Sequence, residues 1–128
     1  MEDENKVIYP ELSYQIIGIL FSVWNDIGYG HKEIFYQKAI AKIFKDKGIN
    51  FKEQERVRVN YRNENLGVYI LDFLVDNKII LEIKKREFFS KKDIEQLYSY
   101  LKAKNLKLGI IAHFTSRGVR FKRVLNIK

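Results

Sequence analysis

Two carboxylates and a lysine are spaced so that neighbouring β-strands could bring them onto one face. Glu82 and Lys84 lie two residues apart in the β-rich run ILEIK, residues 80–84, and side chains two apart share a face of a strand. Asp72 lies in the preceding β-rich run. Opposed carboxylates repel unless a cation lies between them, and Mg²⁺ accepts such oxygen ligands. These residue types therefore indicate a metal site with a lysine beside it.

The length of the loop between the two runs decides whether the three side chains share a face. A three-residue loop places Asp72 opposite Glu82, whereas a two-residue loop sends Glu82 to the other face. An ordinary half-exposed strand, with its charges in water, is a further alternative. In that case the charges would stand among three apolar neighbours, Ile70, Leu74 and Ile80. The residues alone leave these alternatives open.

Hydrophobic periodicity predicts the elements that must position this site. The predicted elements are helices at residues 12–27 and 31–47, a strand from residue 51 with a turn at 63–67, strands at 68–75 and 79–84, a helix at 91–104, and strands at 108–112 and 119–125. The order ααβββαβ(β) indicates an α/β fold with a mixed sheet, in which the last helix crosses over to deliver a central strand.

Positive charge is concentrated near the end of the sequence. Residues 102–128 hold eight of the 24 basic residues and none of the 16 acidic ones. Such a block suits a polyanion, because Lys and Arg release counterions from a phosphate backbone. A solvated surface kept soluble by its charge explains the block equally well. The candidate contacts to nucleic acid are His113, Arg117, Arg120, Lys122 and Arg123.

Composition excludes several other classes of site. The 128 residues, 46% of them hydrophobic, predict an acidic leader at 1–11 and a single domain at 12–128. Without cysteine there is no disulfide, thiolate metal site or cysteine nucleophile. His31 and His113 are too few for a zinc site of several histidines. The lack of a signal peptide or long apolar run predicts a cytoplasmic protein with no membrane partner.

Three motifs, in order, resemble one nuclease family. Asp72, followed after nine residues by EIK at 82–84, resembles the two-part signature of the PD-(D/E)XK nuclease superfamily. GHKEIFY, residues 30–36, matches the GxxExxY signature of a small family placed in that superfamily. QLYSYL, residues 96–101, resembles the Q-L-x-x-Y-L stretch on the helix after the catalytic strand. Leu71 stands where the superfamily name implies proline, a residue that is not a ligand.

The resemblance implies a restriction-endonuclease-like core and metal-dependent hydrolysis of phosphodiester bonds in DNA or RNA, with DNA favoured. Mg²⁺ or Mn²⁺ is the implied cofactor. The implied site consists of metal ligands from Glu33, Asp72, Glu82 and the Ile83 carbonyl, of Lys84 at the attacking water, and of Gln96 as support. Tyr36 and Tyr100, on helical apolar stripes, are assigned to the core.

Two other functions remain open at this point. A nucleic-acid-binding module of the same fold, acting in a larger complex, would need the basic block but no catalysis. The aromatic content of 14% and the Phe88-Phe89 pair also suit a protein-interaction domain. A homodimeric nuclease would satisfy both that observation and the motifs.

Overall fold

The structure is a computed structural model that describes residues 8–127. Most of the predicted acidic leader, residues 1–7, lies outside the described residues, as does Lys128. The elements are α1 (Pro10–Ile27), α2 (Glu33–Asp46), β1 (Phe51–Tyr61), β2 (Glu64–Val75), β3 (Ile79–Lys84), α3 (Lys91–Lys104), β4 (Leu108–Thr115) and β5 (Gly118–Leu125). Their order confirms the predicted α/β class and its succession of elements.

The five strands form one mixed sheet in the order β1-β2-β3-β4-β5. The first three strands make an antiparallel meander, and β4 and β5 form a second antiparallel pair. Helix α3 crosses over between β3 and β4, which are parallel, so β4 becomes a strand with a neighbour on either side. Val75 pairs with Ile79, which confirms the three-residue loop and excludes the two-residue alternative.

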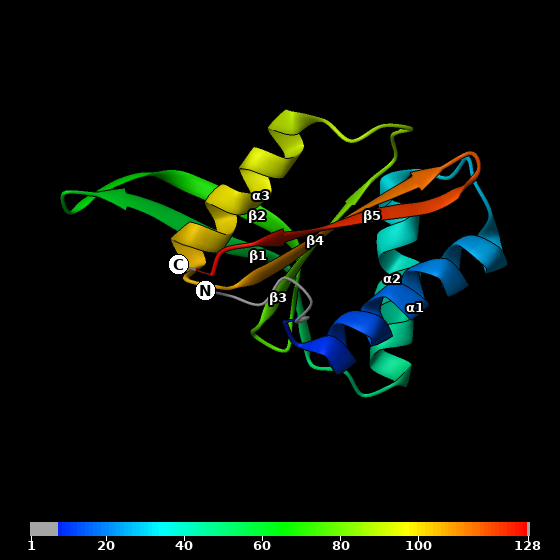
Figure 1. Ribbon diagram of the computed structural model, residues 1–128. Coiled ribbons are helices and arrows are strands. Elements are labelled where there is room, and N and C mark those ends of the chain that lie inside the picture. Colours follow the sequence, from blue (N-terminus) through cyan, green and yellow to red (C-terminus); the bar gives the residue numbers. More distant parts are fainter. Residues whose placement is uncertain (1–7, 128) are drawn as a thin grey trace.

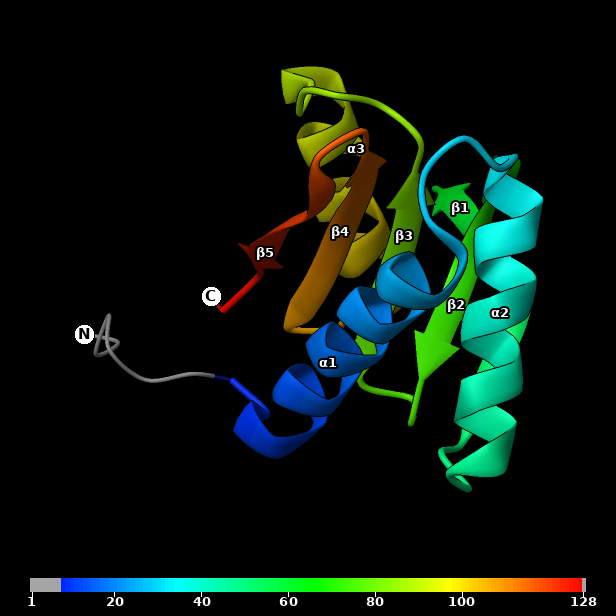
Figure 2. The same cartoon turned by 90° about the vertical axis from the view of Figure 1, so that its right-hand side faces the viewer.

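Helices cover both faces of the sheet (Figures 1 and 2). On one face α1 and α2 pack over inward side chains of β2, β3 and β4, such as Phe73, Leu81 and Ile110. On the other, α3 packs Leu97 and Leu101 against residues of the central strands. We call this second side the α3 face. Alternation along β3 places Glu82 and Lys84 on the α3 face, because Leu81 and Ile83 belong to the opposite cluster.

The β1–β2 hairpin is longer than predicted and extends beyond the rest of the sheet (Figure 1). The turn expected at 63–67 is wrong, since Arg62 and Asn63 turn the chain and Glu64 already belongs to β2. Both turn residues have positive φ, as a two-residue hairpin turn requires. A register shift near Val59 takes up the extra residue of β2.

The start of α1 and the contact between α3 and β4 are two further features of the fold. Helix α1 begins at Pro10, a favoured residue at the first helical position. Between α3 and β4 the approach is close, because a Cβ on Gly109 would lie 2.8 Å from a terminal carbon of Leu97. None of the helices in residues 8–127 combines the length and hydropathy that a membrane span requires.

Candidate active site

Two carboxylates occupy the point where β2 parts from β3. The last paired residues there are Phe73 and Leu81. Beyond them the backbone amide of Asp72 donates to Oε2 of Glu82 at 2.7 Å, and the amide of Ile83 donates to Oδ2 of Asp72 at 2.8 Å. Each carboxylate therefore satisfies an amide that the ladder leaves free. Both acids are fixed at the fork by the opposite strand.

The pleat of β2 breaks at the same point. Leu71 and Leu74 both pack under α3, although regular alternation would put them on opposite faces. Across the hairpin from Asp72, Gln54 of β1 has a positive φ of 50°. Ile70, which was expected to share the α3 face with Leu74, is half exposed. The irregularity turns β2 away from β3 and opens the fork that Asp72 fills.

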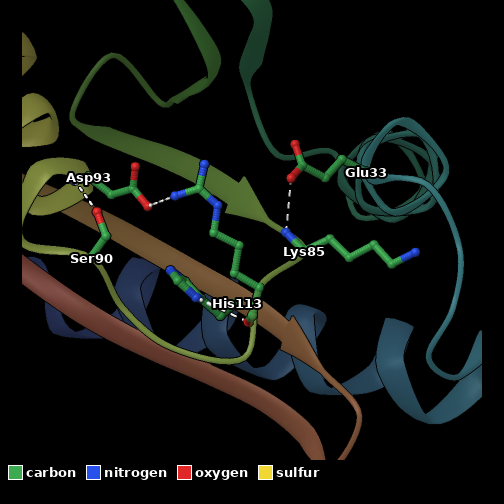
Figure 3. A network of polar contacts seen from close by, with 6 residues as sticks. Glu33, Lys85, Ser90, Asp93 and His113 are labelled. Atoms are coloured by element: carbon green, nitrogen blue, oxygen red, sulfur yellow. Dashed lines mark hydrogen bonds and ion pairs between the residues drawn. The ribbon is translucent and has the colours of Figure 1, made fainter.

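Glu33, the first residue of α2, adds a third carboxylate. Its Oε2 accepts a hydrogen bond of 2.9 Å from the backbone amide of Lys85, just beyond β3 (Figure 3). The amides of Ile83 and Lys85 are two residues apart and both bind carboxylates. In a strand, the carbonyl of a residue points to the same side as its amide, so the Ile83 carbonyl faces Asp72. The structure thus brings Glu33, Asp72, Glu82 and the Ile83 carbonyl along one edge of β3.

The loop between α1 and α2 explains how Glu33 is held there. The hydroxyl of Tyr36 donates to the Gly28 carbonyl at 2.7 Å and accepts from the His31 amide at 3.4 Å. Tyr36 is fully buried, with its ring centroid 4.2 Å from that of Phe114. Gly30 has a φ of 106°, which favours glycine. Tyr36 thus belongs to the core, as predicted, and also fixes the loop.

Burial disfavours the ionised form of the two carboxyl groups at the fork. Burial, followed by the nearby Asp72 charge, raises the pKa of Glu82 to about 8. Burial also raises the pKa of Asp72, against the Ile83 amide and the Lys84 charge that lower it. The Glu33 charge raises both pKa values, and that of Lys84 lowers both. Three carboxyls and one lysine therefore form a single electrostatic cluster.

This donor set fits a divalent cation in its chemistry. Hard ions such as Mg²⁺ take carboxylate and carbonyl oxygens, and a cation would remove the cost of ionising Asp72 and Glu82 together. In the present arrangement the carboxylates accept amide hydrogen bonds. Within residues 8–127, no three such side chains converge on one point closely enough to hold an ion.

Helix α3 presents a tyrosine to this cluster. Tyr100 is buried beside Tyr69, and burial followed by the charges of Glu82, Tyr69 and Asp72 raises the pKa of its phenol to about 12. Its assignment to the core is confirmed, but its electrostatic closeness to the carboxylates was missed. Gln96, the expected supporting residue, is exposed one turn earlier on the helix. The i, i+4 spacing of Gln96 and Tyr100, which puts both residues on one side of the helix, was the signal in the sequence that could have placed Tyr100 near the site.

His113 occupies a different position from the one expected. Its side chain is fully buried, its Nδ1 lies 3.2 Å from the Arg86 carbonyl, and its ring lies 4.1 Å from that of Phe89 (Figure 3). Burial lowers the pKa of the ring. Among residues 8–127, Nε2 has no hydrogen-bond partner. The expected phosphate contact therefore does not fit this structure, because the ring is covered by the loop that carries Arg86 and Phe89.

The four candidate basic residues of β5 and its turn divide between the two faces. Arg120 pairs with His113, which pairs with Lys84, so these three form a row across the α3 face. Lys122, two residues on, lies on the same face, with its ammonium 5.3 Å from the Phe89 ring centroid. Arg117 lies in the β4–β5 turn.

Arg123 lies on the other side of the sheet. Its Nε donates to Oγ of Ser13 in α1 at 3.1 Å, and its guanidinium lies 5.8 Å from the ring centroid of Phe121. Alternation along β5 thus turns Arg123 toward α1 and away from Arg120 and Lys122, and its predicted contact with nucleic acid stays a prediction.

Comparisons with known proteins agree with this architecture. Residues 10–124 match the sequence profile of the PD-(D/E)XK nuclease superfamily. The fold is similar to the crystal structure of SSO0001, with a TM-score of 0.55 and 16% identity over 94% of this chain and 58% of that one. It is also similar to the alkaline exonuclease LHK-Exo from Laribacter hongkongensis, with a TM-score of 0.54 and 10% identity over 95% of this chain and 72% of that one.

These structural likenesses concern the fold alone, since sequence identity is low. This chain spans less than two thirds of the length of SSO0001. None of the curated proteins matches it in sequence.

Proposed function

This chain belongs to the PD-(D/E)XK nuclease superfamily, and from that premise we propose that it hydrolyses phosphodiester bonds with a divalent metal at the β2–β3 fork. The observation that carries the proposal is the reciprocal pairing of Asp72 and Glu82 with amides of each other's strands, beside Lys84. The buried carboxyl of Glu82 and the half-buried carboxyl of Asp72, both with raised pKa values, are costly to ionise together. A bound cation would offset that cost, because its positive charge stabilises both ionised carboxylates.

The roles follow from position along β3. Asp72, Glu82, the Ile83 carbonyl and Glu33 would hold Mg²⁺ or Mn²⁺, which when bound would neutralise charge and polarise the scissile phosphate. Lys84 orients the attacking water, assists its deprotonation and adds a second positive centre. The water oxygen bonds to phosphorus while the bond to the leaving oxygen breaks, and that oxygen takes a proton. Gln96 supports the water or the phosphate.

The finer family assignment is part of the same proposal. Residues 30–36 match GxxExxY, and each defined position of that motif has a physical role in this chain. Gly30 adopts a positive φ, Glu33 binds the Lys85 amide, and Tyr36 anchors the loop. The spacing thus brings a helix N-terminal carboxylate to the end of β3.

A non-catalytic nucleic-acid-binding module is the second candidate. Its basic residues on the α3 face would serve equally well for binding. Without a metal, however, three carboxylates beside the phosphates would weaken binding through repulsion. The carboxylate cluster therefore favours the enzyme.

Several finer expectations stay predictions. We propose DNA rather than RNA as the substrate, a cytoplasmic location, a single domain over residues 12–128 after an acidic leader, and a homodimer. Molar mass in solution would test the homodimer, and the substrate panel described next would separate DNA from RNA.

The decisive experiment is cleavage of labelled DNA and RNA, single- and double-stranded, in Mg²⁺, Mn²⁺ or EDTA. We expect cleavage only with metal, reduced about 100-fold or more by Lys84→Ala and by Glu82→Gln. Lys42→Ala is the matched control, since its side chain is 73% exposed on α2. Binding without cleavage under every condition, unchanged in the Glu82 variant, would leave the binding module instead.

A further inference from the structure

An open pocket lies next to the proposed site, between the β3–α3 loop and the β4–β5 turn. It measures about 340 Å³ and opens where these two segments meet. Its lining residues are Glu87, Phe88, Thr115, Ser116, Arg117 and Arg120. None of these residues has a role in the proposed cleavage step, although Arg117 and Arg120 are candidate phosphate contacts.

One wall of the pocket is built to hold an oxyanion. The backbone amide of Ser116 donates to Oε2 of Glu87 at 2.9 Å, and its hydroxyl donates to Oε1 at 2.7 Å. Those two hydrogen bonds, with the charges of Arg117 and Arg120, lower the pKa of the Glu87 carboxyl. An amide, a hydroxyl and two guanidinium groups are also the donors that phosphate takes in nucleic-acid complexes. Glu87 therefore occupies a place that a phosphate could fill.

The lining also includes an exposed aromatic ring. Phe88 is 77% exposed, a large apolar surface for a residue that follows the charged Glu87. An aromatic ring beside phosphate donors is the combination with which proteins bind single strands, because an unpaired base can stack on it. Bases in a duplex are already stacked and paired, so they cannot use such a ring.

Strand pairing and sequence distance place the pocket near the proposed site, on the other side of the loop that covers His113. Arg120 is joined to Lys84 through His113 by the strand pairing of β3, β4 and β5. Ser116 lies three residues beyond His113, about 10 Å along an extended chain. Glu87 lies three residues beyond Lys84 in the sequence. A nucleic-acid strand that binds with one phosphate near Lys84 could therefore place a neighbouring nucleotide in this pocket.

We propose that the pocket is a subsite for one unpaired nucleotide of a single-stranded nucleic acid, its phosphate on Ser116, Arg117 and Arg120 and its base on Phe88. The phosphate displaces the Glu87 carboxylate, which holds the turn in the absence of substrate. This inference rests on the proposed function for its substrate, and it narrows that substrate to single strands and unpaired ends.

Binding of a short fluorescent single-stranded oligonucleotide and of its duplex, measured in EDTA, tests the subsite apart from cleavage. We expect Phe88→Ala to weaken single-strand binding about tenfold or more, with little effect on the duplex. The double variant Arg117→Ala/Arg120→Ala should reduce the slope of log affinity against log salt by about 1.4. Glu87→Gln should tighten binding several-fold, since it removes the competing charge.

Arg62→Ala is the matched control, because it removes an arginine from a distant hairpin turn. Single-strand affinity unchanged by Phe88→Ala and Glu87→Gln, or a stronger preference for the duplex, would overturn the subsite. Both results are independent of the metal assay: a protein that binds as predicted but never cleaves retains the subsite and loses the proposed activity.

Discussion

The carboxyl of Glu82 is held by forces that conflict. The Asp72 amide donates to it, which favours the charged form, while burial and the neighbouring carboxyl disfavour charge more strongly. A buried acid in such surroundings keeps its proton unless a cation compensates. The site is therefore easiest to fold when it is protonated, and it is ready to bind metal only once it is deprotonated.

This conflict predicts a pH-dependent stability for the metal-free protein. The unfolded chain releases the Glu82 proton near pH 4.5, whereas the folded protein keeps it up to about pH 8. The folded state binds more protons across that window, so the free energy of unfolding should fall as pH rises, by on the order of a few kcal/mol. Urea unfolding in EDTA across the window measures it.

Glu82→Gln is the comparison for that measurement, since an amide oxygen can still accept the Asp72 hydrogen bond. Its stability should vary less with pH than that of the wild type. Mg²⁺ should stabilise the wild type more at the alkaline end of the window than at the acid end, because metal binding releases the proton. Equal pH profiles for the two proteins would show that Glu82 ionises normally.

Residue types and strand parity predicted that Asp72, Glu82 and Lys84 lie together only if the hairpin loop has three residues, a length that the sequence left open and the pairing of Val75 with Ile79 supplies. Burial was harder to predict, because it depends on segments far apart in the chain. The ring of His113 is covered by the Arg86–Phe89 loop, and Tyr100 is placed beside the carboxylates by the packing of α3. Neither the covering of His113 nor the placement of Tyr100 is indicated by the residues next to it in the sequence.

At the scale of elements, the α1–α2 loop determines where Glu33 lies. We predict that Tyr36→Phe, which removes the hydroxyl bonded to Gly28 and His31, will lower stability by about 1–2 kcal/mol because the partly buried Gly28 carbonyl loses its partner. Cleavage should fall further than nucleic-acid binding, since Glu33 loses its fixed position. Tyr61→Phe, at a ring that is 58% exposed, is the control.

The contact between α3 and β4 gives a second prediction. Gly109→Ala would place a Cβ 2.8 Å from Leu97, so we expect a loss of about 1–3 kcal/mol in urea unfolding from overpacking. Gly18→Ala in α1 meets nothing within 4 Å and should instead stabilise the protein by about 0.5–1 kcal/mol. A neutral Gly109 variant would mean that Leu97 changes rotamer freely.

Periodicity predicted the type and order of the elements, because nearly all have a buried stripe or face. The helix at 91–104 has the bounds that its Ser90 cap and apolar stripe indicated. The long β1–β2 hairpin was the exception. Residues 64–67 include two polar residues and a glycine, as a turn does, yet Glu64, Asn65 and Gly67 pair with β1 across a register shift. That pairing depends on tertiary contacts, which local composition does not encode.

At the scale of the molecule, the basic block of the sequence does not form one surface. Lys104 approaches Glu55 at 3.5 Å, and Arg123 lies against α1, so strand alternation and helix position divide the charges. Arg117, Arg120 and Lys122 remain near the α3 face. Charge counted along a sequence therefore overstates the phosphate contacts that the fold can make.

The salt dependence of binding distinguishes contact through the three basic residues near the α3 face from contact through all eight residues of the basic block. Three phosphate contacts should give a slope of log affinity against log salt of about −2 for a single strand, whereas eight would give nearly −6. We expect the lower value, measured by fluorescence anisotropy in EDTA over a range of KCl concentrations. Arg123→Ala should leave the slope unchanged, since its guanidinium binds Ser13 on the far side of the sheet. A steep slope that Arg123→Ala reduces would mean that nucleic acid wraps around β5 and contacts both faces.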